Sequence, residues 1–198
     1  MMLAEIFNKH GCDKTQRHNY HKIYEPYFKK LKDKKINILE IGVFRGAGMS
    51  ALIEYFPKAT VYGIDIFTRV DTDEVQVLQH PRARWMKGDS TKETNLFDGV
   101  KFDLIIDDGY HTPEANKLSF RNTWPQLKEG GLYFIEDVWA MDRMTEAEKK
   151  HKWLLSKPKE FTMEHLNAFY EEISVGKVHH HDNRIMNQPD SYIIRVEK

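Results

Sequence analysis

The pattern of apolar and polar positions predicts helices that alternate with buried strands. In residues 20–31 the apolar side chains recur at i, i+3, i+4, i+7, i+8 and i+11, which places them on one face of a helix. These residues are Tyr20, Ile23, Tyr24, Tyr27, Phe28 and Leu31. A second stripe, formed by Met49, Leu52, Ile53 and Phe56, predicts a helix that opens just after a glycine-rich turn.

Short apolar runs between the helical segments predict strands. Five runs alternate with helix-compatible stretches, and they are KINILEIGV, ATVYGIDIF, RARWMKGD, KFDLIIDD and GLYFIEDV. GKVHHHDNRI and SYIIRVEK then predict a closing antiparallel pair. Apolar strands that alternate with helices are typical of a mainly parallel sheet covered on both faces. We therefore expect a seven-stranded α/β fold that binds ligands at the carboxyl ends of its strands.

We expect residues 1–198 to form a single domain. The sequence contains no internal repeat, and no linker rich in Pro, Gly or Ser divides it. A chain of 198 residues that is 40% hydrophobic can bury a core of normal size.

The composition argues against several classes of protein. Lys+Arg and Asp+Glu are equal at 30 each, so no overall field attracts nucleic acid or an anionic membrane. No basic stripe interleaved with aromatic residues appears, which disfavours nucleic-acid methylation. The single cysteine, Cys12, excludes an internal disulfide. Neither a signal peptide nor a membrane span is apparent, and we expect a soluble cytoplasmic protein.

A glycine-rich turn follows the first predicted strand. LEIGVFRGAGMS places Glu40, Gly42, Gly46 and Gly48 before the next helix, whose N-terminus offers free N–H groups. The spacing GxxxGxG differs from the dinucleotide fingerprint GxGxxG, which disfavours a dinucleotide oxidoreductase. The pattern ExGxxxGxGxS, from Glu40 to Ser50, is similar to motif I of class I S-adenosylmethionine-dependent methyltransferases. The alternative is a tight turn that binds no ligand.

Polar residues also end the second and third predicted strands. Asp65 follows strand two, where an acidic side chain can accept hydrogen bonds from both hydroxyls of a ribose. Asp89 and Ser90 end strand three, where class I methyltransferases typically contact adenine. Solvated loop residues and a simple turn are the alternatives.

Two pairs of carboxylates end the fourth and fifth predicted strands. Neighbouring strands lie ~4.8 Å apart, so Asp107-Asp108 and Glu136-Asp137 should converge at one edge of the sheet. Like charges this close raise one another's pKa unless a cation compensates, and Mg²⁺ suits such oxygen ligands. Successive side chains of a strand face opposite sides, and we favour Asp108 over Asp107 as the ligand. The alternative is that these acids cap helices or pair with Arg121 and Arg143.

His111 follows directly and is a candidate general base. Thr112 can cap a helix and Pro113 suits its first position, so a helix is expected right after His111. An imidazole beside a metal-bound hydroxyl can remove its proton near neutral pH. A purely structural histidine is the alternative.

Six stretches together resemble the metal-dependent sugar O-methyltransferases of macrolide biosynthesis, the mycinamicin and tylosin type. They span roughly residues 8–140 and are GCDKTQRHNYHKIYEPYF, ILEIGVFRGAGMS, YGIDIF, GDS, FDLIIDDGYH and SFRNTWPQLKEGGLYFIEDV. IDDGxH with GGLYxIED some 25 residues later is far more specific than the glycine loop. The resemblance implies a Rossmann-like class I methyltransferase fold that uses S-adenosylmethionine and Mg²⁺.

The resemblance also implies a role for each candidate residue. Asp108, Glu136 and Asp137 are implied as Mg²⁺ ligands and His111 as the general base. The segment around Asp13 is implied to fold over the cofactor. The implied cofactor-binding residues are Lys14, His18, Tyr20, Glu40, Gly42, Gly46, Ser50, Asp65, Asp89, Ser90 and Asp107.

The chain departs from the family pattern on the acceptor side. Cys12 and Tyr110 stand where the family often has Thr and Ser, and residues 141–161 align with nothing in the family. We expect residues 1–33 to form a helical cap over the cofactor and 139–175 a helical insertion beside the acceptor. Trp139 is expected at the mouth of the site. Core packing is expected for the other aromatic candidates, which are Tyr133, Trp153, Phe161 and Tyr170.

The expected function is methyl transfer from S-adenosylmethionine to a vicinal hydroxyl of a sugar or glycosylated small molecule, with Mg²⁺ as second cofactor and His111 as base. A catechol-type O-methyltransferase shares the same chelation chemistry and stays an alternative. A non-catalytic protein that binds S-adenosylmethionine is the alternative from another class. The sequence leaves the acceptor and any homo-oligomer open.

Overall fold

The computed structural model describes residues 1–184 and 188–198. Ile185, the last residue of the predicted strand GKVHHHDNRI, lies outside the described residues. The strands are β1 (Asn37–Ile41), β2 (Thr60–Asp65), β3 (Ala83–Lys87), β4 (Phe102–Asp107), β5 (Leu127–Ile135), β6 (Lys177–Asp182) and β7 (Tyr192–Glu197). The helices are α1 (Leu3–Lys9), α2 (His21–Leu31), α3 (Ala47–Tyr55), α4 (Leu96–Gly99), α5 (Pro113–Thr123), α6 (Lys152–Ser156) and α7 (Met163–Ile173).

The seven strands form one sheet in the order β3-β2-β1-β4-β5-β7-β6, which confirms the predicted architecture. The five strands β1 to β5 pair in parallel, and β7 runs antiparallel to both β5 and β6. The chain order reverses between β1 and β4, and this switch point is where open α/β sheets bind their ligands.

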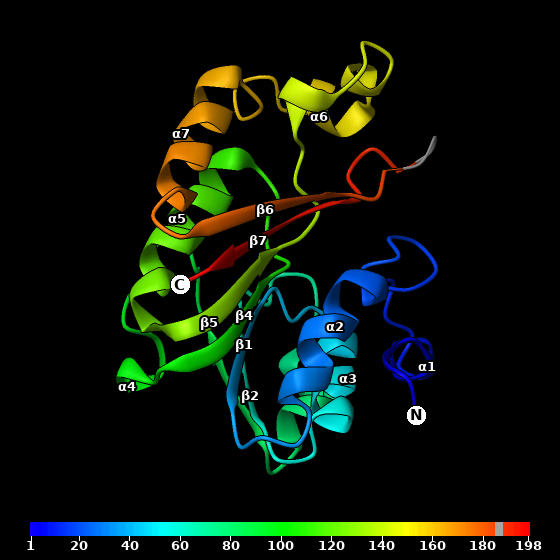
Figure 1. The fold of residues 1–198 in the computed structure, drawn as a ribbon, viewed down its shortest axis with the longest axis vertical. Coiled ribbons are helices and arrows are strands. Elements are labelled where there is room, and N and C mark those ends of the chain that lie inside the picture. The colour runs from blue at the N-terminus through cyan, green and yellow to red at the C-terminus, as the bar shows by residue number, and fades with distance from the viewer. Residues whose placement is uncertain (185–187) are drawn as a thin grey trace.

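Helices cover both faces of the sheet, as Figure 1 shows. Helices α1, α2 and α3 lie on one face, and α5 and α7 lie together on the other. Because the central strands β1 and β4 are buried along most of their length, each face of the sheet has its own buried core. Phe28, Leu52 and Phe134 belong to the first core, and Phe120, Tyr133 and Phe169 belong to the second.

The start of α5 follows the predicted local chemistry. Thr112 is the N-cap, and its Oγ1 accepts a hydrogen bond from the N–H of Ala115 at 3.3 Å. Pro113 occupies the first turn, where its missing N–H costs no hydrogen bond. The cap fixes where the helix begins, and it therefore fixes the loop from Asp108 to His111 at the carboxyl edge of the sheet.

The described residues include no helix with the length and apolarity that a bilayer span requires.

Candidate active site

The carboxyl ends of β1, β4 and β5 bring the candidate residues to one edge. The N–H of Asp108 donates to the carbonyl oxygen of Ile41 at 2.9 Å. The N–H of Glu136 donates to the carbonyl oxygen of Asp107, also at 2.9 Å. The parallel ladder therefore continues one residue beyond each strand. This register sets Gly42, Asp108 and Glu136 side by side at the switch point.

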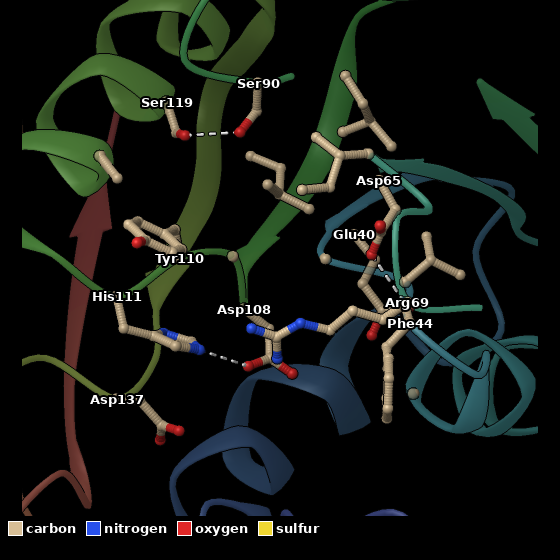
Figure 2. A pocket seen from close by; sticks show the side chains of 18 of the residues that line it. Glu40, Phe44, Asp65, Arg69, Ser90, Asp108, Tyr110, His111, Ser119 and Asp137 are labelled. Atoms are coloured by element: carbon tan, nitrogen blue, oxygen red, sulfur yellow. Dashed lines mark hydrogen bonds and ion pairs between the residues drawn. The ribbon is translucent and has the colours of Figure 1, made fainter. Parts of the chain in front are cut away.

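A cavity of about 1790 Å³ opens along this edge. It exceeds the volume of ~300–1,000 Å³ that is usual for one small-molecule site, so it has room for more than one ligand. The candidate residues that line it are Lys14, Glu40, Gly42, Ser50, Asp65, Asp89, Ser90, Asp108, His111 and Asp137. Figure 2 shows several of these side chains around the same space.

The other candidate residues lie behind the cavity wall. Tyr20 is buried and donates its O–H to Asp137 Oδ1 at 2.7 Å. His18 Nδ1 lies 2.8 Å from Ser191 Oγ and 3.5 Å from Asp137 Oδ1. Asp107 is buried and accepts from the N–H of Gly109. None of these three lines the cavity, and neither do Gly46 and Glu136.

The glycine turn leaves no room for side chains at two positions. A Cβ at Gly42, whose φ is +87°, would lie 2.0 Å from the carbonyl oxygen of Asp108. A Cβ at Gly48 would lie 2.0 Å from Oε1 of Glu40. A side chain at Gly42 would therefore collide with backbone, whereas at Gly48 the end of the Glu40 side chain would have to move. The turn ends at Gly46, the N-cap of α3.

Asp65 connects two loops at the rim of the cavity. Its carboxylate accepts hydrogen bonds from the N–H of Phe44 at 2.8 Å and from that of Phe67 at 2.6 Å. Both phenylalanines have positive φ, at +49° and +44°. A non-glycine residue in the left-handed backbone conformation is strained by ~1–3 kcal/mol, and the hydrogen bonds to Asp65 help to offset this strain at Phe44 and Phe67.

Ser90, at the far side of the same wall, lies 2.7 Å from Ser119 of α5, Oγ to Oγ. Asn122 donates to the carbonyl of Ser90 at 2.9 Å, so α5 fixes the loop after β3. Sequence reasoning missed Ser119, although its position on the helix after His111 was a usable signal. Arg69 also lines the cavity and was missed, because nothing in its local sequence marks it.

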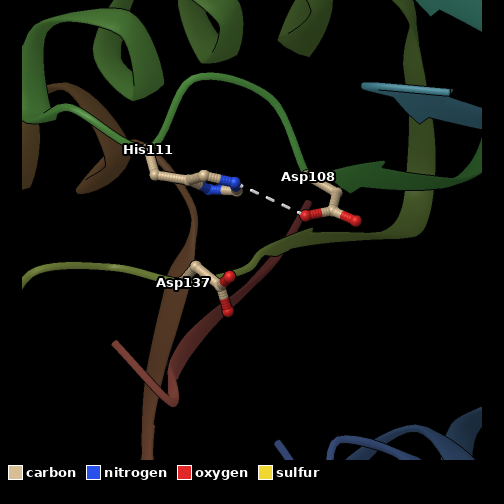
Figure 3. A group of neighbouring side chains, drawn as sticks. All are labelled: Asp108, His111 and Asp137. Carbon is tan, nitrogen blue, oxygen red and sulfur yellow. Dashed lines mark ion pairs between the residues drawn. The ribbon is translucent and has the colours of Figure 1, made fainter. Parts of the chain in front are cut away.

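Asp108, His111 and Asp137 form one group that could hold a metal ion. Each offers one ligand atom, and these atoms all lie within 4.8 Å of one another. His111 Nε2 is 3.6 Å from Asp108 Oδ1 (Figure 3). His111 and Asp137 both have positive φ, +60° and +50°. Strained backbone conformations of this kind are common at functional sites. Here they turn the side chains of His111 and Asp137, which lie on neighbouring loops, toward each other.

Glu136 faces a buried basic group instead. Its carboxylate contacts Lys14 Nζ and the Tyr24 hydroxyl, and the side chain is 2% exposed. Lys14 Nζ also lies 2.7 Å from Asp108 Oδ2. Burial alone would lower the pKa of Lys14, but the charges of Asp108 and Glu136 raise it well above its ordinary value. Lys14 therefore stays an ammonium ion between two carboxylates.

The alternative partners considered for these acids lie elsewhere. Arg121 pairs with Glu172, and Arg143 pairs with its neighbour Asp142 at 3.3 Å. Within the described residues, neither arginine forms an ion pair at the carboxyl edge of the sheet.

Two further carboxyl groups near the site are buried with one oxygen unpartnered. Glu40 Oε2 and Asp107 Oδ2 have no hydrogen-bond partner among the described residues. Burial raises the pKa of Glu40 to about 8 and that of Asp107 to about 7. Glu40 is one of the residues that line the cavity, so this unfilled hydrogen-bonding position lies at the cavity wall.

Aromatic side chains line the side of the cavity next to His111. Trp139 lines it as predicted, and Tyr133 and Phe161 are buried in the core as predicted. Trp153 differs from the prediction, because it lines the cavity while also packing against the core. Tyr110 is 49% exposed there. The prediction of core packing for Trp153 rested on residue type, which does not specify which part of its ring remains exposed.

Comparison with known proteins identifies the family. A family model described as a methyltransferase domain matches residues 39–138, about half of the chain. The chain therefore belongs to this methyltransferase-domain family, which confirms the resemblance to class I methyltransferases. The match runs from β1 through the residue after Asp137, and so includes both strand ends of the candidate metal site.

Two curated relatives are O-methyltransferases according to their names, and the name of the second specifies a rhamnosyl compound. The chain is 30% identical over 129 residues to the mycinamicin VI 2''-O-methyltransferase of Micromonospora griseorubida, covering 59% of this chain and 31% of that protein. It is 31% identical over 147 residues to the 8-demethyl-8-alpha-L-rhamnosyl tetracenomycin-C 2'-O-methyltransferase of Streptomyces olivaceus, covering 69% and 37%. The chain thus spans about a third of the length of these relatives.

Solved structures share the fold. The MycE methyltransferase of the mycinamycin biosynthetic pathway, in complex with Mg and SAH, superposes with a TM-score of 0.70 at 23% identity. That match covers 100% of this chain and 54% of MycE. A fibrillarin from Methanococcus jannaschii, a pre-rRNA processing protein, gives a TM-score of 0.54 at 20% identity, covering 83% of this chain and 66% of fibrillarin. At such identities the likeness concerns the fold alone.

Proposed function

We propose that this chain is an S-adenosylmethionine-dependent, Mg²⁺-dependent O-methyltransferase that acts on a vicinal hydroxyl of a sugar or glycosylated small molecule. The observation that carries the proposal is the convergence of Asp108, His111 and Asp137 on the cavity that the glycine turn and Asp65 also line. Sugar O-methyltransferases among the relatives support the acceptor class.

The residues on one side of the cavity fit S-adenosylmethionine. Gly42 and Gly48 keep the wall free of side chains, and Glu40 presents a buried oxygen without a partner. Asp65 and Ser90 supply polar groups farther along the wall. The cofactor carries a methyl group already activated by the sulfonium charge. The role of the protein is then to position an oxygen nucleophile in line with that methyl group.

The chemistry of the ligand set fits Mg²⁺. Asp108, Asp137 and Glu136 are the proposed ligands, and carboxylate oxygens are what this ion prefers. Asp108 and Asp137 face the cavity, whereas Glu136 contacts Lys14 and Tyr24. When bound, the ion would orient two adjacent hydroxyls and lower the pKa of the one that reacts. Tyr20 positions Asp137 through its 2.7 Å hydrogen bond.

His111 is the proposed general base. Its Nδ1 lies 3.3 Å from the carbonyl oxygen of Glu136. A carbonyl oxygen only accepts, so this contact places the proton of the neutral imidazole on Nδ1. Nε2 then keeps its lone pair on the side of Asp108 and Asp137, where it can take a proton from an acceptor hydroxyl.

We assign the two flanking segments by the same argument. Residues 1–33 carry Lys14 and Tyr20 to the carboxyl edge, which supports the role of a cap over the cofactor. Residues 139–175 contribute Trp139 and Trp153 to the cavity, which supports an acceptor-side role. A cytoplasmic location is also proposed, in keeping with the single buried cysteine, which is free.

Calorimetry and a transfer assay test the function together. The protein should bind S-adenosylmethionine and S-adenosylhomocysteine and should transfer labelled methyl groups to glycosides with vicinal hydroxyls only when Mg²⁺ is present. A catechol belongs in the same acceptor panel. Binding of the cofactor with no transfer to any acceptor would favour the non-catalytic alternative, and undiminished transfer in EDTA would refute the metal.

A further inference from the structure

A short segment of the cavity wall has a local excess of lysine, although the chain has no extended basic stripe. Residues 149–159 contain five lysines and no acidic residue, although the whole chain has 30 basic and 30 acidic residues. The lysines are Lys149, Lys150, Lys152, Lys157 and Lys159. Such a local excess of one sign attracts ligands of the opposite sign into a cleft.

This segment is attached next to the candidate metal site. The ring of Trp139, two residues after Asp137, packs against His151 with centroids 4.9 Å apart. His151 caps α6, because its Nδ1 accepts from the N–H of Trp153 at 3.3 Å. The cap fixes the start of α6, and Lys152, its first residue, lies on the cavity wall.

Lys157 joins the segment to the loop that carries His111. Its Nζ lies 3.9 Å from the ring centroid of Tyr110 and 3.8 Å from that of Trp153, and it donates to the Tyr110 hydroxyl. The two rings meet edge to face with centroids 6.3 Å apart. Both aromatic residues line the cavity. They form an aromatic platform, and Tyr110 directly precedes His111, the proposed base, in the sequence.

Two lysines of the segment face the cavity with no ionic partner. Lys152 and Lys159 both line it, and neither forms an ion pair with any residue in the described ranges. Lys149, by contrast, pairs with Glu146 at 2.9 Å. Glu160 is the carboxylate nearest in sequence that also lines the cavity, and it leaves the lysines in excess on this wall.

We propose that the acceptor is an anionic saccharide, whose sugar ring packs on Tyr110 and Trp153 while its carboxylate or phosphate binds Lys152 and Lys159. This inference rests on the proposed function and deepens it, because it names the acceptor class. The C–H face of a sugar ring gains dispersion contacts from an aromatic platform. A charge-assisted hydrogen bond from lysine to an anionic oxygen is about twice as strong as a neutral one.

Matched ligand pairs isolate the charge of the acceptor. We would titrate 4-nitrophenyl β-D-glucoside against 4-nitrophenyl β-D-glucuronide, and glucose against glucose 1-phosphate, with and without S-adenosylhomocysteine. At least one anionic member should bind about 10- to 100-fold more tightly than its neutral partner, as expected for contacts to a charged group. The two pairs distinguish a carboxylate from a phosphate.

A second experiment reverses the charge of Lys152 and Lys159 on the cavity wall. The double variant K152E/K159E should remove the preference for the anionic member. The matched control is K34E/K35E, which changes the net charge by the same amount. Both lysines lie in the exposed turn before β1, at the amino-terminal end of the strand and so opposite the carboxyl ends that the cavity follows. W153A should weaken both members of a pair to a similar degree, since the platform contacts the ring and not the charge.

Binding is measured without turnover, so the inference and the proposed function fail separately. Equal or tighter binding of the neutral glycosides would overturn the inference even if those glycosides are methylated. The inference also fails if K34E/K35E abolishes the preference as strongly as K152E/K159E, or if a single-stranded oligonucleotide binds more tightly than either anionic saccharide. Absence of cofactor binding would overturn the proposed function instead.

Discussion

Lys14 and Asp108 form an ion pair of 2.7 Å between residues that are 94 positions apart in the sequence. The same ammonium group contacts Glu136, and its side chain is 3% exposed. Lys14 lies in the segment between α1 and α2, so this pair connects the N-terminal helices to the carboxyl ends of β4 and β5. A buried ammonium thus balances carboxylates that we propose as metal ligands.

Replacing Lys14 by Met should destabilise the protein strongly in EDTA. The change leaves Glu136 buried beside Asp108 without a counter-ion, and breaking one partner out of a buried pair costs ~3–5 kcal/mol. Urea denaturation measures the loss in the free energy of unfolding. Added Mg²⁺ should restore more stability to the variant than to the wild type, because the metal then replaces the missing charge.

The matched control is Lys9→Met, which breaks the exposed Lys9–Glu54 pair. Exposed pairs contribute ~0–1 kcal/mol, so this variant should stay close to the wild type. Equal stability of Lys14→Met and Lys9→Met in EDTA would show that Lys14 is not a buried counter-ion.

The sequence predicted the sheet because its signals are local. Five apolar runs between helical stripes gave β1 to β5, and Thr112-Pro113 gave the start of α5. Alternation along β4 also separated Asp108, which lines the cavity, from the buried Asp107. These features depend on neighbours within a few positions.

The details of the site depend on contacts that no local pattern encodes. Asp and His are enriched at positive φ, but residue type does not specify that His111 and Asp137 adopt this conformation, which turns their side chains toward Asp108. The contact of Glu136 with Lys14 and Tyr24 likewise joins segments more than 100 residues apart. A count of carboxylates at strand ends could not distinguish Glu136 from Asp137.

Asp137→Asn should weaken metal binding while leaving the fold intact. Its carboxylate is one of three groups within 4.8 Å, and an amide is a poorer ligand for a hard cation than a carboxylate. Binding of Mn²⁺, followed by electron paramagnetic resonance, measures the affinity directly. Asp142→Asn, an exposed change outside the cavity lining, is the control. Retention of wild-type Mn²⁺ affinity by Asp137→Asn would exclude it as a ligand.

His111→Ala should lower turnover about 10²- to 10⁴-fold, the usual contribution of a general base. Affinity for S-adenosylhomocysteine should change little, because His111 belongs to the metal group rather than to the glycine turn. Single-turnover kinetics and calorimetry separate these two effects. Full activity of the variant would remove His111 from the mechanism, whereas loss of cofactor affinity would give it a binding role.

Glu40 should make stability depend on pH. Burial raises its pKa to about 8 from an ordinary value of 4.5 in the unfolded chain. The folded state therefore holds a proton that the unfolded state has lost between these two values. The contribution of Glu40 to stability is full below about pH 4.5 and declines as the pH rises through about 8.

Glu40→Gln removes this titration and keeps the shape of the side chain. The wild type should lose stability relative to the variant between pH 5 and 8, by on the order of a few kcal/mol in total. Urea denaturation of both proteins across that range measures the difference, and taking the difference cancels groups such as Asp107 that titrate in both. Parallel stability curves would mean that Glu40 is already ionised in the folded protein.

S-adenosylmethionine, which carries a sulfonium charge, should favour the ionised carboxylate, so its affinity for the wild type should rise with pH more steeply than its affinity for Glu40→Gln.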